Sequence, residues 1–405
     1  MRATNSTIRA VNRLMSRWAT APGFAADGGT VFSAAGVWPL LAFLADVADG
    51  PARDELADAI GLSPEQAACG ARELLAALDS VRELEAAVGL WTRRTPTLKE
   101  EWRAGLPADA TGALTGDPEA DGAALDAWAS KRTGGQIERM PVRTSEDTEF
   151  VLASALALTT TWETPFKGDL TVPSAGPWQG RELAGLYRSE RGLDGVRLVT
   201  AGTGRVTEAC VRGEGAVDVH LLLGEEGMRP AHVLTAGVEA LAGELPAVPG
   251  GRLPYGDAGP GLGVARTRSY FPEPPSTTLN TVEFTVDAEH DLLARPEPFG
   301  LAAARALPSL PGISDAPLVV GSAQQSATAT FSSAGFRAAA VTAVEVAYMG
   351  FPPATPEYET VRATVSVDRP FGFLAVHRET RLVLAAGWVT DPKPFPEDEN
   401  AYVVE

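Results

Sequence analysis

Apolar residues recur at helical spacing through much of the first 145 residues. One predicted N-terminal helix has an apolar face made of Ile8, Val11, Met15 and Trp18. The same spacing, with stop signals such as Gly50-Pro51 and Gly61, predicts further helices over 36–49, 52–62, 64–90 and 119–140. This part of the chain is therefore expected to be mainly helical.

After residue 147 the pattern changes to strand-like runs. FVLASALALTTTW (150–162) is apolar without a polar face, which is typical of a strand buried on both sides. Residues 217–224 and 281–293 indicate further strands, whereas the Pro- and Gly-rich segment 245–263 predicts irregular structure. Helices first, long strands later and no βαβ alternation predict an α+β domain.

Composition narrows the classes of partner. The 405 residues are 45% apolar and carry a formal net charge of −18, which disfavours nucleic acid and anionic membranes. No run reaches the roughly 18 apolar residues that span a bilayer, and the N-terminus lacks a signal-peptide pattern. A soluble, cytoplasmic protein is expected. The scarcity of lysine beside arginine, with heavy alanine use, suggests a G+C-rich, actinomycete-like bacterial genome.

Four collinear segments resemble the serpin family of serine protease inhibitors. They are 30–62, 125–167 with its W-x-x-P-F motif, 284–336, and 367–392 with VDRPFGFLAVHRETRLVLAAGWVTDP. The resemblance implies one serpin-like domain over 1–405. In that fold, N-terminal helices pack on large, mostly antiparallel sheets, and a reactive-centre loop is exposed. It also implies a hinge and loop over 334–365 and a C-terminal strand pair over 366–392.

In an inhibitory serpin this loop is bait for a protease, and after cleavage its first half inserts into the main sheet. The inhibitor itself needs no catalytic residue, cofactor or metal. The implied hinge residues are Gly335, Phe336, Arg337, Ala338, Ala339, Ala340, Val341 and Thr342. The family's hinge spacing places the reactive bond between Met349 and Gly350. Its neighbours Tyr348 and Phe351 suit a chymotrypsin-like or subtilisin-like serine protease.

Insertion requires a strand with one inward face. Even-numbered residues from Phe336 share one face, the charges of Arg337 and Glu345 share the other, and 336–351 contains no proline. Phe336 stands where inserting serpins usually carry a small threonine or serine. A bulky side chain at that position risks overpacking of roughly 1–3 kcal/mol.

The sheet-opening region also departs from the family pattern. Its positions correspond to Ser33, Gly36, Ser154 and Gln325, of which only Ser33 keeps the usual residue, while Trp162 is retained. Two hypotheses therefore stand. One is a monomeric suicide-substrate inhibitor of a serine protease. The other is a non-inhibitory serpin-fold protein used as an interaction module, or recruited to bind or transform a small molecule in bacterial metabolism.

Histidines and cysteines are few and scattered. None of the four histidines shows metal-ligand spacing, and no G-x-S-x-G or H-E-x-x-H motif occurs. We expect His220 and His377 to be hydrogen-bonded structural residues, and Cys69 and Cys210 to be small side chains rather than nucleophiles.

Overall fold

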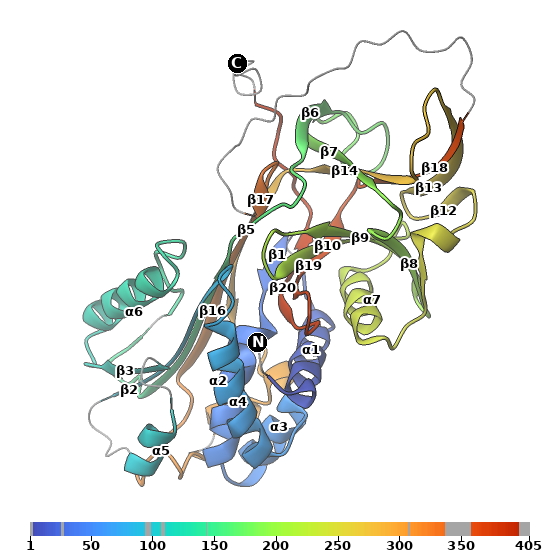
Figure 1. Ribbon diagram of the computed structural model, residues 1–405. Helices are drawn as coiled ribbons and strands as arrows, with labels where there is room; N and C mark the ends of the chain where they lie inside the picture. The colour runs from blue at the N-terminus through green and yellow to red at the C-terminus, as the bar shows by residue number, and fades with distance from the viewer. Residues whose placement is uncertain are drawn as a thin grey trace.

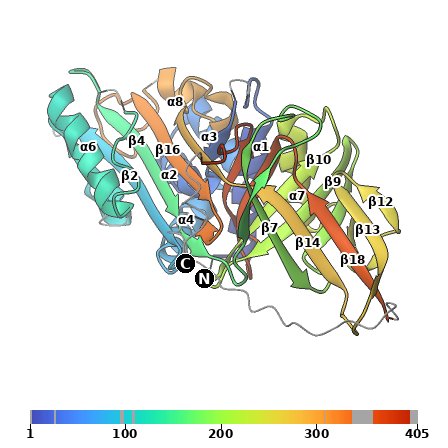
Figure 2. The same ribbon diagram turned by 90° about the horizontal axis from the view of Figure 1, so that it is seen from above.

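Helices lie on both sides of a large sheet, and two further sheets complete the molecule (Figure 1). The computed structural model describes residues 3–25, 28–93, 99–106, 110–142, 144–306, 308–336 and 358–396. Figure 2 shows the large sheet, which contains β2, β4 and β16, and the sheet that contains β7, β14 and β18 on opposite sides of the molecule.

The helices follow the apolar spacing of the sequence. They are α1 (Asn5–Ala19), α2 (Ala34–Val47), α3 (Gly50–Ile60), α4 (Pro64–Leu78), α5 (Glu100–Gly105), α6 (Pro118–Arg132), α7 (Pro230–Ala242) and α8 (Ala302–Ala306), with 3-10 turns η2 (Gly250–Arg252) and η3 (Glu297–Phe299). All four residues of the predicted α1 face are buried, and the Thr4 side chain caps this helix by accepting the Thr7 N–H. Helix α3 ends at Gly61, whose φ of 67° suits glycine.

The main sheet carries the candidate site. Its order is β3 (Thr111–Leu114), β2 (Leu84–Arg93), β4 (Phe150–Leu158), β16 (Ser322–Phe331), β17 (Gly335–Phe336) and β5 (Thr160–Thr161), with β15 (Phe284–Asp291) paired to β16. Strand β4 is buried along its whole length, as the sequence predicted. Alternate residues of β4 face opposite sides of the sheet. Val151, Ala153 and Ala155 pack with α6 on one side, whereas Leu152 and Leu156 join the core on the α2 side.

Two smaller sheets complete the fold. The second sheet has the order β1 (Thr30–Phe32), β20 (Val383–Val389), β19 (Phe371–His377), β10 (Val217–Gly224), β9 (Gly204–Arg212), β8 (Val196–Ala201) and β11 (Ala247–Pro249). The third has the order β12 (Gly256–Gly259), β13 (Leu262–Ser269), β18 (Tyr358–Ser366), β14 (Ser276–Val282), β7 (Leu183–Arg191) and β6 (Lys167–Thr171). Helix α7 packs against β8, β10 and β19 of the second sheet.

Two sequence-based assignments were wrong. The helix predicted over 64–90 ends at Leu78, and residues 84–93 form β2, which pairs antiparallel with β4. LEAAVGL contains few β-branched residues, so burial between the α6 side and the core decides its conformation rather than propensity. The segment 245–263 is not simply irregular, because it contains β11, β12 and the start of β13.

Within the ranges given above, no helix combines the length and apolar character needed to cross a bilayer.

Candidate functional site: the sheet opening and the hinge

The candidate site lies where β4 and β16 meet in the middle of the main sheet. The two strands run parallel, with residues 322–327 opposite 151–156. Any strand inserted between them must break this ladder. Beneath it, on the α2 side, lie the side chains that the sequence assigned to the sheet-opening region.

The structure brings Ser33, Ser154 and Gln325 together in one fully buried polar group beside Gly36, which we call the opening cluster. The Gln325 Oε1 accepts the Ser33 N–H at 2.7 Å, and the Gln325 Nε2 donates to the Ser33 carbonyl at 2.9 Å and to the Ser154 Oγ at 3.4 Å. The Ser33 hydroxyl caps α2 by accepting the Gly36 N–H at 3.2 Å and donates to the Leu384 carbonyl at 2.6 Å. One glutamine therefore ties the start of α2 to both central strands.

Glycine at position 36 is required by this arrangement. A Cβ added there would overlap the Ser154 hydroxyl and would lie 3.5 Å from the Gln325 Nε2. Gly36 thus leaves room for the Ser154 hydroxyl, which accepts a hydrogen bond from the Gln325 amide. Buried polar groups that are all hydrogen-bonded favour one closed arrangement of the sheet.

Trp162 fixes the turn that precedes the hinge. Its Nε1 donates to the Ser332 carbonyl at 3.0 Å, and its backbone N–H donates to the Ala334 carbonyl at 3.1 Å. The Ser333 N–H donates to the Glu283 carboxylate at 3.4 Å. Burial raises the pKa of Glu283, opposed by Lys393 and by the Ser333 N–H. The turn 332–334 is therefore held from both sides.

The hinge begins inside the main sheet. In β17, Gly335 pairs with Thr161, while Phe336 pairs with Thr160 on one side and Phe331 on the other. The Phe336 side chain is 1% exposed, and its ring centroid lies 5.8 Å from that of Phe373. The bulky residue that the sequence singled out thus already lies in the core. The other predicted hinge residues, 337–342, and the predicted reactive-bond region, 348–351, lie outside the described residues.

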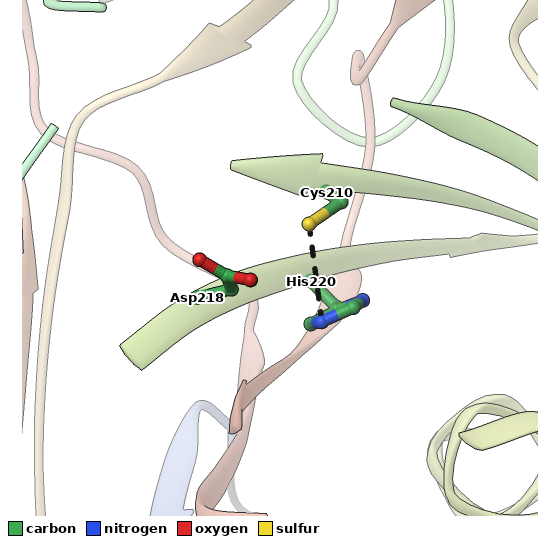
Figure 3. Close-up of side chains that lie close together, drawn as sticks. All are labelled: Cys210, Asp218 and His220. Atoms are coloured by element: carbon green, nitrogen blue, oxygen red, sulfur yellow. Dashed lines mark hydrogen bonds between the residues drawn. The ribbon is translucent and has the colours of Figure 1, made fainter. Parts of the chain in front are cut away.

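A second polar constellation, which sequence reasoning missed, lies on the second sheet. Figure 3 shows Cys210, Asp218 and His220, one ligand atom of each lying within 4.8 Å of the others. The Cys210 Sγ is 3.9 Å from the His220 Nε2, and the His220 Nδ1 is 2.6 Å from the Glu208 Oε1. Polar residues at alternate positions in TEACV and VDVHL were the available signal, because alternation on paired strands gathers them on one face.

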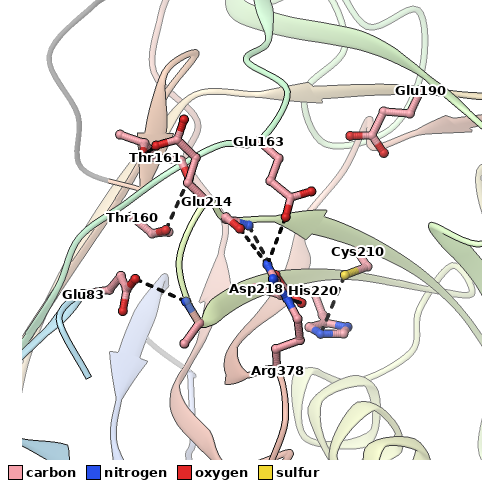
Figure 4. Close-up of polar contacts among 12 residues, drawn as sticks. Glu83, Thr160, Thr161, Glu163, Glu190, Cys210, Glu214, Asp218, His220 and Arg378 are labelled. Carbon is pink, nitrogen blue, oxygen red and sulfur yellow. Dashed lines mark hydrogen bonds and ion pairs between the residues drawn. The ribbon is translucent and has the colours of Figure 1, made fainter. Parts of the chain in front are cut away.

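Asp218 is committed to an arginine. The Arg378 Nε and Nη2 contact the Asp218 carboxylate at 2.7–3.1 Å, and the Arg378 Nη2 also donates to the Gly213 carbonyl at 2.6 Å. A longer ion pair of 3.5 Å joins Arg378 to Glu163, next to Trp162 (Figure 4). This network connects the second sheet to the segment that holds the hinge turn.

Known proteins resemble this chain in sequence and in fold. Residues 12–175 match the family model for serpins, described as serine protease inhibitors. Serpin-Z6C of rice (Oryza sativa subsp. japonica) is 24% identical over 423 aligned residues, which cover 96% of each chain.

Solved structures agree on the fold. The native thermophilic serpin tengpin matches with a TM-score of 0.71 at 15% identity, covering 95% of this chain and 93% of its own. Human thyroxine-binding globulin in complex with thyroxine matches with a TM-score of 0.71 at 17% identity, covering 96% and 99%. The family description supports protease inhibition as the general function. Residues 12–175 therefore resemble the serpin family model, and the chain as a whole has the serpin fold.

Proposed function

We propose that this serpin-fold protein belongs to the serpin family and inhibits a serine protease as a suicide substrate, through cleavage of its loop and insertion of the loop into the main sheet. The observation that carries the proposal is β17. Gly335 and Phe336 already occupy a ladder position between β16 and β5, so the strand that would insert has its first residues in register.

The buried Phe336 removes one objection to insertion. A large first side chain would slow insertion if the core had to make room for it after cleavage. Because the ring already packs beside Phe373, that rearrangement is part of the native fold. Strand alternation then directs Ala338, Ala340 and Thr342 inward, and all three are small.

The opening cluster supplies the closed state from which insertion would start. Insertion between β4 and β16 must break the parallel ladder and the bond between the Gln325 Nε2 and the Ser154 Oγ. The backbone hydrogen bonds lost between β4 and β16 are replaced by bonds from β4 to the inserted strand. The other edge of the inserted strand forms a further set of bonds with β16. The cluster therefore sets a barrier to opening rather than the final balance of free energy.

The reactive bond and the target are finer parts of the proposal. We place the bond between Met349 and Gly350, with Tyr348 and Phe351 beside it, and we propose a chymotrypsin-like or subtilisin-like protease as the target. We further propose that the protein acts as a monomer in the cytoplasm, without nucleic acid or membrane as partner.

The test uses matched arginine substitutions on opposite faces of the proposed strand. Ala340→Arg places a charge on the inward face, and Ala339→Arg places the same charge on the outward face. Each protein is incubated with a chymotrypsin-like protease and analysed by denaturing electrophoresis. Wild type and Ala339→Arg are expected to give a band at the summed mass that survives denaturation, whereas Ala340→Arg is expected to be cleaved without a complex.

Cleavage of all three proteins without a complex would contradict inhibition. That result would favour the non-inhibitory alternative, an interaction module or a protein that binds or transforms a small molecule. Mass spectrometry of the cleaved fragments locates the bond in either case.

A further inference from the structure

A hydrogen-bonded chain of Cys210, His220 and Glu208 lies on the face of the second sheet that carries α7. His220 lies two residues before Leu222, which contacts Gly237 of α7, so the two side chains share this face. The His220 ring joins the Cys210 sulfur, 3.9 Å from its Nε2, to the Glu208 carboxylate, 2.6 Å from its Nδ1. The proposed inhibitory mechanism uses none of these three side chains.

The carboxylate that orients the imidazole is itself fixed. The Arg197 Nε and Nη2 contact the two oxygens of Glu208 at 2.7 and 2.6 Å, and Glu208 is 1% exposed. A carboxylate at the Nδ1 side favours the doubly protonated ring, with the Nε2–H directed at the sulfur. This is the order nucleophile, base and orienting group that activates a thiol.

The surrounding charges favour a negative sulfur. The guanidinium groups of Arg188, Arg197 and Arg378 lie within electrostatic range of Cys210. Each nearby carboxylate already has an arginine partner, and the pairs are Glu208 with Arg197, Asp218 and Glu163 with Arg378, and Glu190 with Arg188. Among the described residues, the His220 ring, which Glu208 also contacts, is the cationic side chain that contacts the sulfur.

The protonation of His220 agrees with this geometry. Burial disfavours the charged ring, but the charge of Cys210 and the hydrogen bonds to Cys210 and Glu208 outweigh it and raise the pKa of His220 to about 10. Despite burial, the bonds and charges of His220 and Arg197 hold the pKa of Glu208 below its usual range.

We propose that Cys210 is a reactive thiolate, held by the His220 imidazolium, and that small soft electrophiles and peroxides modify it. With a peroxide, the sulfur attacks one oxygen and the O–O bond breaks. The leaving oxygen takes the proton of the imidazolium. The thiolate is oxidised to a sulfenic acid, and hydrogen peroxide is reduced to water. Cys210 is partly exposed as a residue, and the proposal requires that a small reagent can reach its sulfur.

A metal site fits these residues less well. Zinc would need Asp218 as its third protein ligand, but that carboxylate is held by two nitrogens of Arg378 and by the Gly213 N–H. A cation there would lie beside a guanidinium. A metal ion would also require the neutral His220 ring, whereas Cys210 and Glu208, the two acidic partners of this ring, favour its charged form.

The chain carries its own reference thiol. Cys69, in α4, is exposed, and its sulfur lies 4.0 Å from the Glu73 carboxylate rather than beside an imidazole. The full-length protein is therefore treated with iodoacetamide at about pH 6, and mass spectrometry follows both cysteines in one sample.

We expect Cys210 to react about tenfold faster than Cys69 or more at that pH, although Cys69 is the more exposed. His220→Asn should remove the advantage, and Glu208→Gln should reduce it. A sulfenic-acid probe after peroxide should label wild type but not Cys210→Ser. The rate at Cys210 should stay nearly level as the pH rises, while the rate at Cys69 climbs.

The pH dependence of the two alkylation rates in the wild-type protein tests the proposal even where a variant fails to fold. A rate at Cys210 that is below the rate at Cys69 at about pH 6 and rises with pH in parallel would overturn the proposal. Stoichiometric Zn²⁺ binding that protects Cys210 from alkylation, and that Asp218→Asn abolishes, would overturn it in favour of a metal site.

Discussion

The opening cluster predicts a specific stability effect at Gln325. Gln325→Ala removes three hydrogen bonds and leaves the N–H and the carbonyl of buried Ser33 without this partner. Three bonds at about 1 kcal/mol each, with part of the desolvation cost of two orphaned groups, give a loss of about 3–5 kcal/mol. The loss falls on the N-terminus of α2 and on both central strands together.

The loss predicted for Gln325→Ala can be converted into a shift of the melting temperature. Unfolding entropy of about 2.1 cal/mol/K per residue, over 405 residues, makes roughly 0.85 kcal/mol/K. A loss of 3–5 kcal/mol therefore lowers the first thermal transition by about 4–6 °C. Differential scanning calorimetry of the uncleaved protein measures this shift.

Gln324→Ala is the matched control. Gln324 is the adjacent residue of β16, on the opposite face of the strand, and no hydrogen bond of its side chain is found among the described residues. Its substitution should change stability by no more than about 1 kcal/mol. Equal shifts for the two variants would refute the reasoning, because they would mean that the buried amide contributes nothing beyond strand packing.

Three further predictions concern stability. Gly36→Ala should lower the free energy of unfolding by about 1–3 kcal/mol, because the added Cβ clashes with the Ser154 hydroxyl. Adding Ser154→Ala should recover part of that loss, which a double-mutant cycle measures. Phe336→Ala should lower the free energy of unfolding by about 3–5 kcal/mol, because it leaves a cavity in the core. If the Phe336 side chain were instead exposed to solvent, the substitution would leave the melting temperature unchanged. Burial lowers the pKa of His290, so the folded state resists its protonation. Stability should therefore fall as pH drops below about 6.5, and His290→Leu should flatten that slope in urea titrations at several pH values.

Much of the fold was predictable because local signals and burial agreed. The apolar face of α1 follows from apolar spacing, the stop at Gly61 from its glycine, and the two-sided burial of β4 from its continuous apolar run. Strand β2 was not predictable in this way. Its alanine- and leucine-rich sequence suits a helix, and only its place beside β4 makes it a strand.

The sites show the same division. The residues of the opening cluster were named from the family pattern, but their mutual fit was hidden, because Gly36 makes room for the Ser154 hydroxyl, and Gln325 reaches that hydroxyl, only in the folded chain. The proximity of Cys210 and His220 was not predicted, since a sequence does not reveal the register of β9 on β10 that sets them opposite each other. Register depends on long-range packing, so pairing across a hairpin is the information that the pattern lacks.

The central claim is that β17 is the first part of a strand that enters the main sheet after cleavage. Hydrogen exchange of the intact and the protease-cleaved protein, together with the melting temperature of each, tests it directly. In the cleaved protein, residues 337–346 are expected to become as protected as β4 and β16, and the melting temperature is expected to rise. Unprotected residues 337–346 with an unchanged or lower melting temperature would contradict it.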